Sequence, residues 1–390
     1  MSYLRTLSTR SLLVLVAAVA LLAGGGAAIA VAAGGGSGPT PPPKALPEAL
    51  HDALAASKPD GITARIKFTN NLFPSGALVG QAGSALLSGA SGRLWLTNDG
   101  RGRLELQSDA GDAQVVWNQS DVTVYDASSN TVYHAKLPAH QQQSESANSA
   151  PPSVTEIANF LTKVGQHADV SDARPTNVAG QPAYSVSVSP KHDGGLLGSA
   201  ELAWDAARGV PLRIGIYAQG SSSPVLQLEA THISYGAVSD AAVSVSPPAG
   251  AKTVDVGTPS ANHGSDSTAK PVSGLDAVQA AAGFQVVAPD TLVGLPRQDV
   301  RLVGKAALVV YGHGLGAIVV VERAADTAAS GSGGGMLSSL PTVSLDGSTG
   351  HELATQLGTV LGWQRNGVDF VLAGSLPPAA AETAARDLSK

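Results

Sequence analysis

Short stretches in which apolar and polar residues alternate recur along residues 92–235 of this chain. They lie at residues 92–97, 103–107, 114–117, 122–125, 131–134, 184–188, 201–204, 212–216 and 226–229. Successive side chains of a strand point to opposite faces, so this pattern predicts antiparallel strands with one apolar and one solvated face. So many strands in succession predict a single large curved sheet, whose apolar concave side is suited to hold a hydrophobic ligand.

The segments before these strands include a helix and an unusual loop. Residues 46–56 have the pattern of a short amphipathic helix, and residues 61–68 that of a first strand. Residues 70–91 interrupt the alternation and mix apolar side chains, Phe73 among them, with Gly and Ser. An apolar loop is unusual at a protein surface. Two interpretations are open. The loop is a flap that covers a pocket or touches a membrane, or it fills the core of its own domain.

A second helix is predicted at residues 153–165. Ser153 followed by Glu156 has the form of a capping box, and Gly165 supplies the stop. The apolar stripe of this helix consists of Ile157, Phe160, Leu161 and Val164. A lone amphipathic helix among strands is expected to lay its stripe on the sheet, where it acts as a lid or as filler.

A second, smaller domain is predicted at residues 273–390, after a polar linker at residues 257–272. Helices are predicted at residues 275–282 and 379–388, and strands at residues 300–303, 306–311, 317–322, 360–364 and 368–372. Asn366-Gly367 between the last two strands is a strong signal for a tight hairpin. The first domain is predicted to span residues 46–256, with residues 243–250 as its last extended segment.

The N-terminus indicates the compartment. Arg5 and Arg10 precede an apolar run at residues 12–33, so residues 1–33 are predicted to be a signal anchor, a transmembrane helix with its basic end cytoplasmic. Residues 34–45 form a Gly/Pro-rich linker. We expect a single-pass protein of the plasma membrane whose bulk is extracytoplasmic. The alternative is a cleaved signal peptide and a secreted protein, because Ala28-Ile-Ala30 resembles a cleavage site.

Composition and motifs argue against catalysis and against nucleic-acid binding. The 390 residues carry 24 basic and 30 acidic side chains, a net charge of −6, which gives no basic footprint for nucleic acid. The absence of Cys excludes disulfides and thiolate metal sites. Residues 312–316 resemble a dinucleotide loop but join two strands, and His351-Glu352 lacks the second His of a zinc motif. We therefore expect no catalytic residue, no metal and no cofactor.

Two phrases of the sequence resemble a known family. Residues 201–213 read as a strand, an Asp turn, Gly-x-Pro and a strand, and residues 243–251 resemble that family's closing phrase. With the order of elements over residues 46–256, they resemble the LolA/LolB-like lipoprotein-carrier superfamily, including its periplasmic regulators of the RseB/MucB type. Residues 273–390 resemble the small second domain of the RseB-like proteins. The resemblance implies an α+β protein: an incomplete antiparallel β-barrel with a helical lid around a cavity for acyl chains, plus a small α+β domain.

This interpretation predicts a non-enzymatic protein that binds a lipid or an acylated lipoprotein. One alternative is an envelope-stress sensor that modulates a separate membrane regulator, since the segment before residue 12 is too short to be a cytoplasmic signalling domain. A structural envelope module without a ligand is the other. The candidate residues for the hydrophobic cavity and its lid are Phe73, Leu94, Leu96, Leu104, Leu106, Val122, Val124, Phe160, Val186, Val188, Leu202, Trp204, Ile214, Ile216, Leu226 and Leu228.

Overall fold

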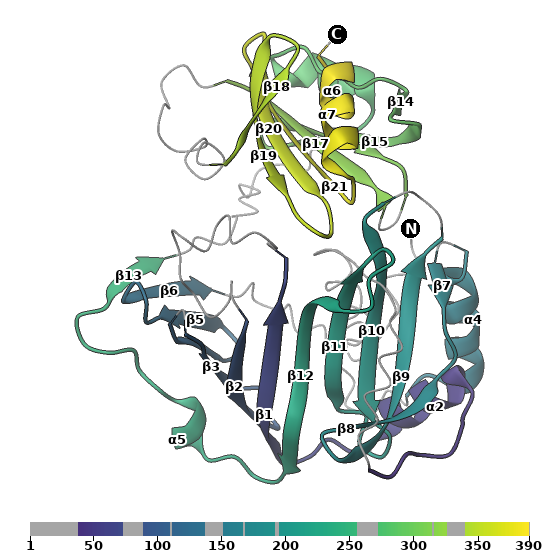
Figure 1. Ribbon diagram of the computed structural model, residues 1–390, viewed down its shortest axis with the longest axis vertical. Coiled ribbons are helices and arrows are strands. Elements are labelled where there is room, and N and C mark those ends of the chain that lie inside the picture. Colours follow the sequence, from purple (N-terminus) through teal and green to yellow (C-terminus); the bar gives the residue numbers. More distant parts are fainter. Residues whose placement is uncertain are drawn as a thin grey trace. The chain divides into compact units, whose positions relative to one another are not determined.

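The computed structural model describes residues 38–72, 89–109, 111–136, 151–166, 168–191, 195–255, 272–313, 316–325 and 340–389 (Figure 1). The chain divides into two compact units. Unit 1 comprises Met1–Ser189 and Ser199–Asn262, and unit 2 comprises Pro190–Gly198 and His263–Lys390. None of the described helices has the length and apolar character needed to cross a membrane. The anchor predicted at residues 1–33 lies outside the described residues.

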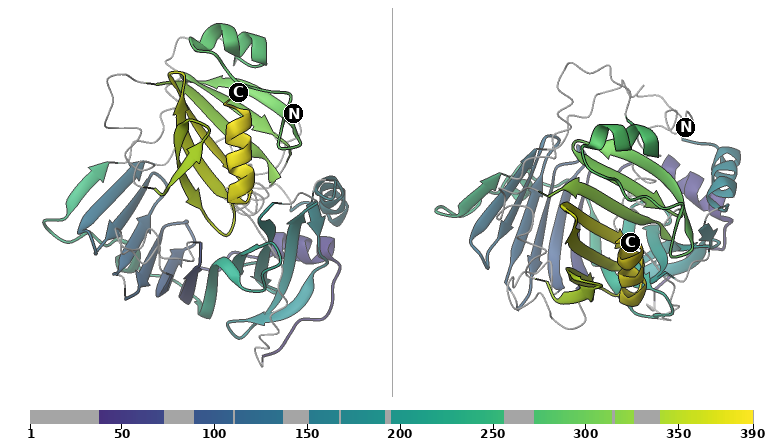
Figure 2. Two further views of the ribbon diagram at one scale, coloured as in Figure 1. Left: turned by 45° about the horizontal axis from the view of Figure 1, so that its top comes forward. Right: turned by 90° about the horizontal axis from the view of Figure 1, so that it is seen from above.

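The described strands of unit 1 form one curled sheet (Figure 2). Its strand order is β13-β6-β5-β4-β3-β2-β1-β12-β11-β10-β9-β7, and β8 pairs with β9 off this path. The strands are β1 (Gly61–Asn70), β2 (Ala90–Thr97), β3 (Gly102–Gln107), β4 (Ala113–Trp117), β5 (Asp121–Asp126), β6 (Thr131–Lys136), β7 (Ala168–Val170), β8 (Arg174–Val178), β9 (Gln181–Pro190), β10 (Leu197–Asp205), β11 (Pro211–Ala218), β12 (Pro224–Tyr235) and β13 (Lys252–Asp255). The mostly β architecture and the curled sheet agree with the predicted half-barrel.

Two helices pack at one end of this strand order. α2 (Leu46–Ala55) and α4 (Val154–Val164) coincide with the two predicted helices. In α4 the capping box is complete, because the Ser153 hydroxyl accepts from the Glu156 N–H and the Glu156 carboxylate accepts from the Ser153 N–H. α4 contacts α2 and the short strand β7. The helix therefore lies beside α2 at the β7 end of the sheet.

The last strand of unit 1 joins the sheet at a place that the sequence pattern did not indicate. After β12 it forms the short helix α5 (Asp240–Val243), and the last strand of the unit is β13, further on than the predicted segment at residues 243–250. Pro247 and Pro248, which lack N–H donors, separate the two elements. β13 pairs in parallel with β6, as Lys252 opposite Thr131 shows.

Unit 2 contains a second sheet with the strand order β14-β15-β16-β17-β21-β20-β19-β18. Its strands are β14 (Thr291–Leu292), β15 (Leu295–Val303), β16 (Ala306–Tyr311), β17 (Ile318–Ala324), β18 (Thr342–Leu345), β19 (Ser348–Ala354), β20 (Thr359–Arg365) and β21 (Val368–Gly374), with helices α6 (Leu275–Ala282) and α7 (Pro378–Asp387). Asn366 and Gly367 have φ values of 51° and 75°, as a tight hairpin turn requires. Beyond that turn Trp363 stacks on its cross-strand partner Phe370, with ring centroids 5.0 Å apart.

Candidate functional site

The apolar face of the unit 1 sheet is continuous across its strands. Leu94 lies opposite Leu104, which lies opposite Val115, which lies opposite Val124. On the other side of β1, Phe68 lies opposite Leu228, and Leu228 opposite Ile214. Cross-strand neighbours share a face, so the alternation of the sequence is carried through the register of the sheet. We call this surface the apolar face, and the opposite surface the polar face.

Two helices pack against the sheet at the β9–β10 end. Trp204 lies opposite Tyr184 and Leu202 opposite Val186. These four side chains pack in one cluster with Leu46 and Ala49 of α2 and with Leu161 of α4. Trp204 is only 2% exposed. Trp204, Leu202 and Val186 therefore belong to the core between helices and sheet, while Val188 lies one step along the strand, opposite Ala200.

The middle of the apolar face is a second core region. Leu106 is buried together with Ile62 and Ile66 of β1. Leu94, Leu96 and Leu104 are partly buried and pack against this cluster. Ile216 in β11 is buried as well, opposite Leu226. These candidate residues therefore contribute to the hydrophobic core of unit 1.

Other candidates are more accessible. Leu228 is 37% exposed, and Tyr133, which shares the apolar face through its partner Val124, is 39% exposed. The remaining accessible candidates, each half-buried, are Val122, Val124, Ile214, Leu226 and, on α4, Phe160. Phe73 lies outside the described residues. That these residues line a ligand cavity stays a prediction.

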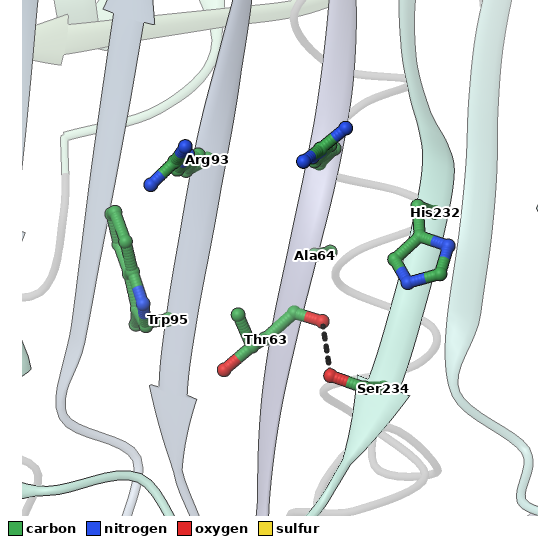
Figure 3. A pocket seen from close by; sticks show the side chains of 7 residues that line it. Thr63, Ala64, Arg93, Trp95, His232 and Ser234 are labelled. Carbon is green, nitrogen blue, oxygen red and sulfur yellow. Dashed lines mark hydrogen bonds between the residues drawn. The ribbon is translucent and has the colours of Figure 1, made fainter.

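The polar face carries two adjoining hollows that the sequence analysis did not anticipate. One, of about 320 Å³, is lined by Thr63, Ala64, Arg65, Arg93, Trp95, His232 and Ser234 (Figure 3). The other, of about 350 Å³, is lined by Arg65, Ser91, Gly92, Arg93, Glu105 and Gln107. Alternation alone put Arg65, Arg93 and Trp95 on the polar face. Only the pairing of β1 with β2 and β12 brings them together.

The most buried carboxylate of unit 1 has a structural role. Asp205 ends β10, and its Oδ1 accepts from the backbone N–H groups of Ala207 and Arg208. Its Oδ2 accepts from the Tyr235 hydroxyl at 2.6 Å, and burial, with this bond, raises the pKa of Tyr235 above its usual range. Asp205 is the Asp of the turn phrase at residues 201–213, and its bonds are those of a turn cap.

A half-buried ionic group ties three strands together on the polar face. Arg213 of β11 pairs with Glu201 of β10 and, at 3.5 Å, with Glu229 of β12. The neighbouring Tyr217 is buried, and desolvation raises its pKa to about 12. Each cation and carboxylate here is matched, as the interior of a protein requires. In the described part of the chain, no three His, Asp or Glu side chains are grouped so that they could hold a metal ion.

Comparisons with known proteins concern the fold. No protein-family model matches the chain, and no curated protein matches it. Among solved structures, the Pseudomonas aeruginosa MucA/MucB complex has a chain 16% identical, with 87% of this chain and 96% of that chain covered and a TM-score of 0.42. A structure of MucB in complex with MucA(peri) is 15% identical, with 87% and 97% covered and a TM-score of 0.41.

A more distant similarity is to a LolA superfamily protein of Nitrosomonas europaea. It is 7% identical, covers 52% of this chain and 98% of that chain, and has a TM-score of 0.21. MucB and a LolA superfamily protein are thus among the solved structures to which this chain is similar.

Proposed function

We propose that unit 1 binds the acyl chain of a lipid or of an acylated lipoprotein along its apolar face. The observation that carries the proposal is the accessibility of this face along β12 and along β4 to β6. Among the described residues, the exposed large apolar side chains of the unit 1 sheet are Leu228 and Tyr133, and both lie on the apolar face. They are separated by β1 to β5 in the strand order, and partly exposed apolar side chains of the same face lie between and beside them. A sheet face that leaves apolar side chains accessible in this way is suited to an apolar partner.

The proposal separates two regions of the sheet. At the β9–β10 end the sheet packs against α2 and α4, with Trp204 and Tyr184 buried. From β12 and across β4 to β6 the apolar face keeps half-buried Val and Leu side chains. An acyl chain laid on the second region would remove apolar area from water, worth about 25 cal/mol per Å². The first region would hold the sheet in shape in the absence of a ligand.

The proposal includes a membrane tether. Arg5 and Arg10 followed by the apolar residues 12–33 favour an anchor with the basic end in the cytoplasm, which leaves both units on the outer side. A protein held there meets lipids and lipoproteins as they leave the membrane. A separate membrane regulator is the partner expected if binding is also signalled.

The test is binding of a fluorescent fatty acid to the purified protein, together with mass spectrometry of co-purified lipid. The chain offers a matched pair of valines. Val124→Asn alters the apolar face, whereas Val116→Asn alters the polar face, where Val116 lies opposite Arg103. Removing an apolar contact from the site is expected to weaken binding roughly five- to tenfold.

The expected result is binding by the wild type, weaker binding by Val124→Asn and Leu228→Asn, and unchanged binding by Val116→Asn. The proposal is overturned if the wild type neither binds the probe nor carries lipid. It is also overturned if Val124→Asn and Val116→Asn weaken binding to the same extent, because the loss of binding would then not depend on which face of the sheet is altered.

A further inference from the structure

A row of positive side chains crosses the polar face, on the side of the sheet away from the proposed acyl site. Arg65 of β1 is the direct cross-strand partner both of Arg93 in β2 and of His232 in β12. Arg65, Arg93 and His232 are all exposed. Like charges placed directly opposite one another destabilise a sheet. An anionic ligand bound between the two arginines would relieve this repulsion.

The two arginines have no counter-ion in the described part of the chain. Neither guanidinium makes a hydrogen bond or an ion pair there. The nearest carboxylate along the row is Glu105, the cross-strand partner of Arg93, and it is taken by Arg103. Their charges are therefore available to a ligand.

Neighbouring carboxylates and cations are already engaged. Glu229 is bound to Arg213, and Arg101 holds Asp99 and Asp240. The contrast is sharp on this face: Arg101, Arg103 and Arg213 are paired, whereas Arg65 and Arg93 are not.

The surroundings of the pair are those of a binding site. Both arginines line both hollows of the polar face. In Figure 3, the side chains of Arg93, Trp95, Thr63, His232 and Ser234 lie on the same side of the sheet. The Ser234 hydroxyl donates to the Thr63 carbonyl at 3.3 Å, which fixes that edge of the hollow.

Trp95 provides an apolar wall next to the charges. It lies opposite Thr63 on one side and Arg103 on the other, and the Arg103 guanidinium stacks 5.1 Å from the indole centroid. This cation–π contact orients the indole. A ligand whose anionic end meets the arginines can lay its carbon part against Trp95.

We propose that Arg65 and Arg93 bind the phosphate group of a phosphate monoester, with Trp95 covering the organic part of the ligand. Two guanidiniums offer pairs of N–H donors in the fork geometry that matches phosphate oxygens. A monoester carries about −1.5 to −2 charges near pH 7, which balances both arginines, whereas a carboxylate balances one. A hollow of about 320 Å³ has the size of a small-molecule site.

The test uses the full chain and three probes: inorganic phosphate, glycerol 3-phosphate, and vesicles of phosphatidylcholine with or without phosphatidic acid. Arg65→Gln and Arg93→Gln remove one charge each. Lys136→Gln is the matched control, because Lys136 is an exposed cation on the same face, in β6, opposite Asp121. Each arginine substitution is expected to weaken binding roughly five- to tenfold, and wild-type binding should fall as salt rises.

A second readout guards against loss of fold. Inorganic phosphate should raise the Tm of the wild type, because it binds the folded state, and the same phosphate concentration should raise the Tm of Arg93→Gln less. Without phosphate, Arg93→Gln should melt at the same temperature as the wild type or higher, since a like-charge contact is gone.

The outcomes separate the sources of the ligand. Binding of the two soluble probes that is weakened roughly five- to tenfold in both arginine variants supports a free phosphate monoester. Binding of phosphatidic acid vesicles alone, weakened in the same variants, supports a lipid headgroup. The proposal fails if no probe binds, or if Lys136→Gln weakens binding as much as the arginine variants do. The hollows lie on the polar face, whereas the proposed acyl site lies on the apolar face. The phosphate-binding result therefore does not depend on whether the protein binds an acyl chain, and the two proposals can fail separately.

Discussion

The hydroxyl of Tyr235 donates a 2.6 Å hydrogen bond to the Asp205 carboxylate and so joins the end of β12 to the turn after β10. Asp205 is 1% exposed, and the other oxygen of its carboxylate caps the turn. Arg208 lies over the Tyr235 ring at 4.3 Å and closes the arrangement. Two strands that are not neighbours in the sheet are thereby held at a fixed separation.

Tyr235→Phe should therefore destabilise unit 1. It leaves a buried carboxylate oxygen without its donor, which costs about 1–3 kcal/mol. The measurement is the free energy of unfolding from urea denaturation. Tyr125→Phe is the control: its hydroxyl makes an exposed bond to Asn130 at 3.2 Å, and its loss should cost less than about 0.5 kcal/mol. Equal costs for the two variants would contradict the role given to Asp205.

Glu322 predicts a pH dependence of the stability of unit 2. It occupies a core-facing position of β17, is 0% exposed, and accepts one hydrogen bond, from the Val287 N–H at 2.8 Å. Burial raises its pKa from 4.5 to about 7. Between these values the folded state holds a proton that the unfolded state has released. The contribution of Glu322 to stability is therefore full below pH 4.5 and is lost as pH rises to 7, by about 3 kcal/mol.

The comparison of wild type with Glu322→Gln isolates this effect, because the other titrating groups cancel. The free energy of unfolding of the wild type, relative to the variant, should fall between pH 5 and pH 8. A difference that stays constant over this range would show that Glu322 does not carry the proton.

The two faces of the unit 1 sheet can be tested at neighbouring positions. Leu106→Asp places a charge where the side chain is 2% exposed, which should cost about 3 kcal/mol or more and abolish folding of the unit. Gln107→Asp, one residue along and exposed, should change stability by less than about 0.5 kcal/mol. The measurement is the melting temperature of each variant relative to the wild type, followed by circular dichroism. Similar damage from both substitutions would refute the assignment of the faces.

The turn between β8 and β9 contains a strained residue. Ala179 has φ 54° and is followed by Gly180 with φ 79°, whereas the equivalent turn of unit 2 has Asn366 before Gly367. Asn adopts the left-handed region more readily than Ala. Ala179→Asn should stabilise the protein by about 0.5–1 kcal/mol. Ala127→Asn, in an exposed turn without a positive φ, should bring no gain in Tm.

The predicted tether has a direct biochemical test. If residues 1–33 are an anchor, the mature protein should remain with membranes through an alkaline carbonate wash, and its sequence should begin near Met1. A mature N-terminus near Ala33, with the protein released into the medium, would instead identify a cleaved signal peptide.

The local pattern of the sequence determined much of the fold. Alternation located the strands around Leu94, Leu104 and Val124, the Ser153–Glu156 box located the start of α4, and Asn366-Gly367 located a hairpin. Each of these signals depends on residues close together in the chain. The sequence analysis missed β7, β8 and β13 of unit 1 and β14, β18 and β19 of unit 2. Each of these strands is short or lacks a clear alternation of apolar and polar residues, so little in the local sequence distinguishes it from a loop.

Tertiary structure decided what the pattern left open. Alternation states that Arg65, Arg93 and His232 avoid the apolar face, but their row exists only because β1 pairs with both β2 and β12 in one register. Which of the apolar candidates are buried and which stay accessible also depends on segments far away in the sequence. Trp204 is buried because α2, some 150 residues earlier in the chain, packs on it. Leu228 is 37% exposed and belongs to neither core cluster among the described residues of unit 1. The amino-acid sequence determines which side chains are apolar and therefore favour burial away from water. Strand register and helix packing determine which of these side chains are buried and which remain accessible to a ligand.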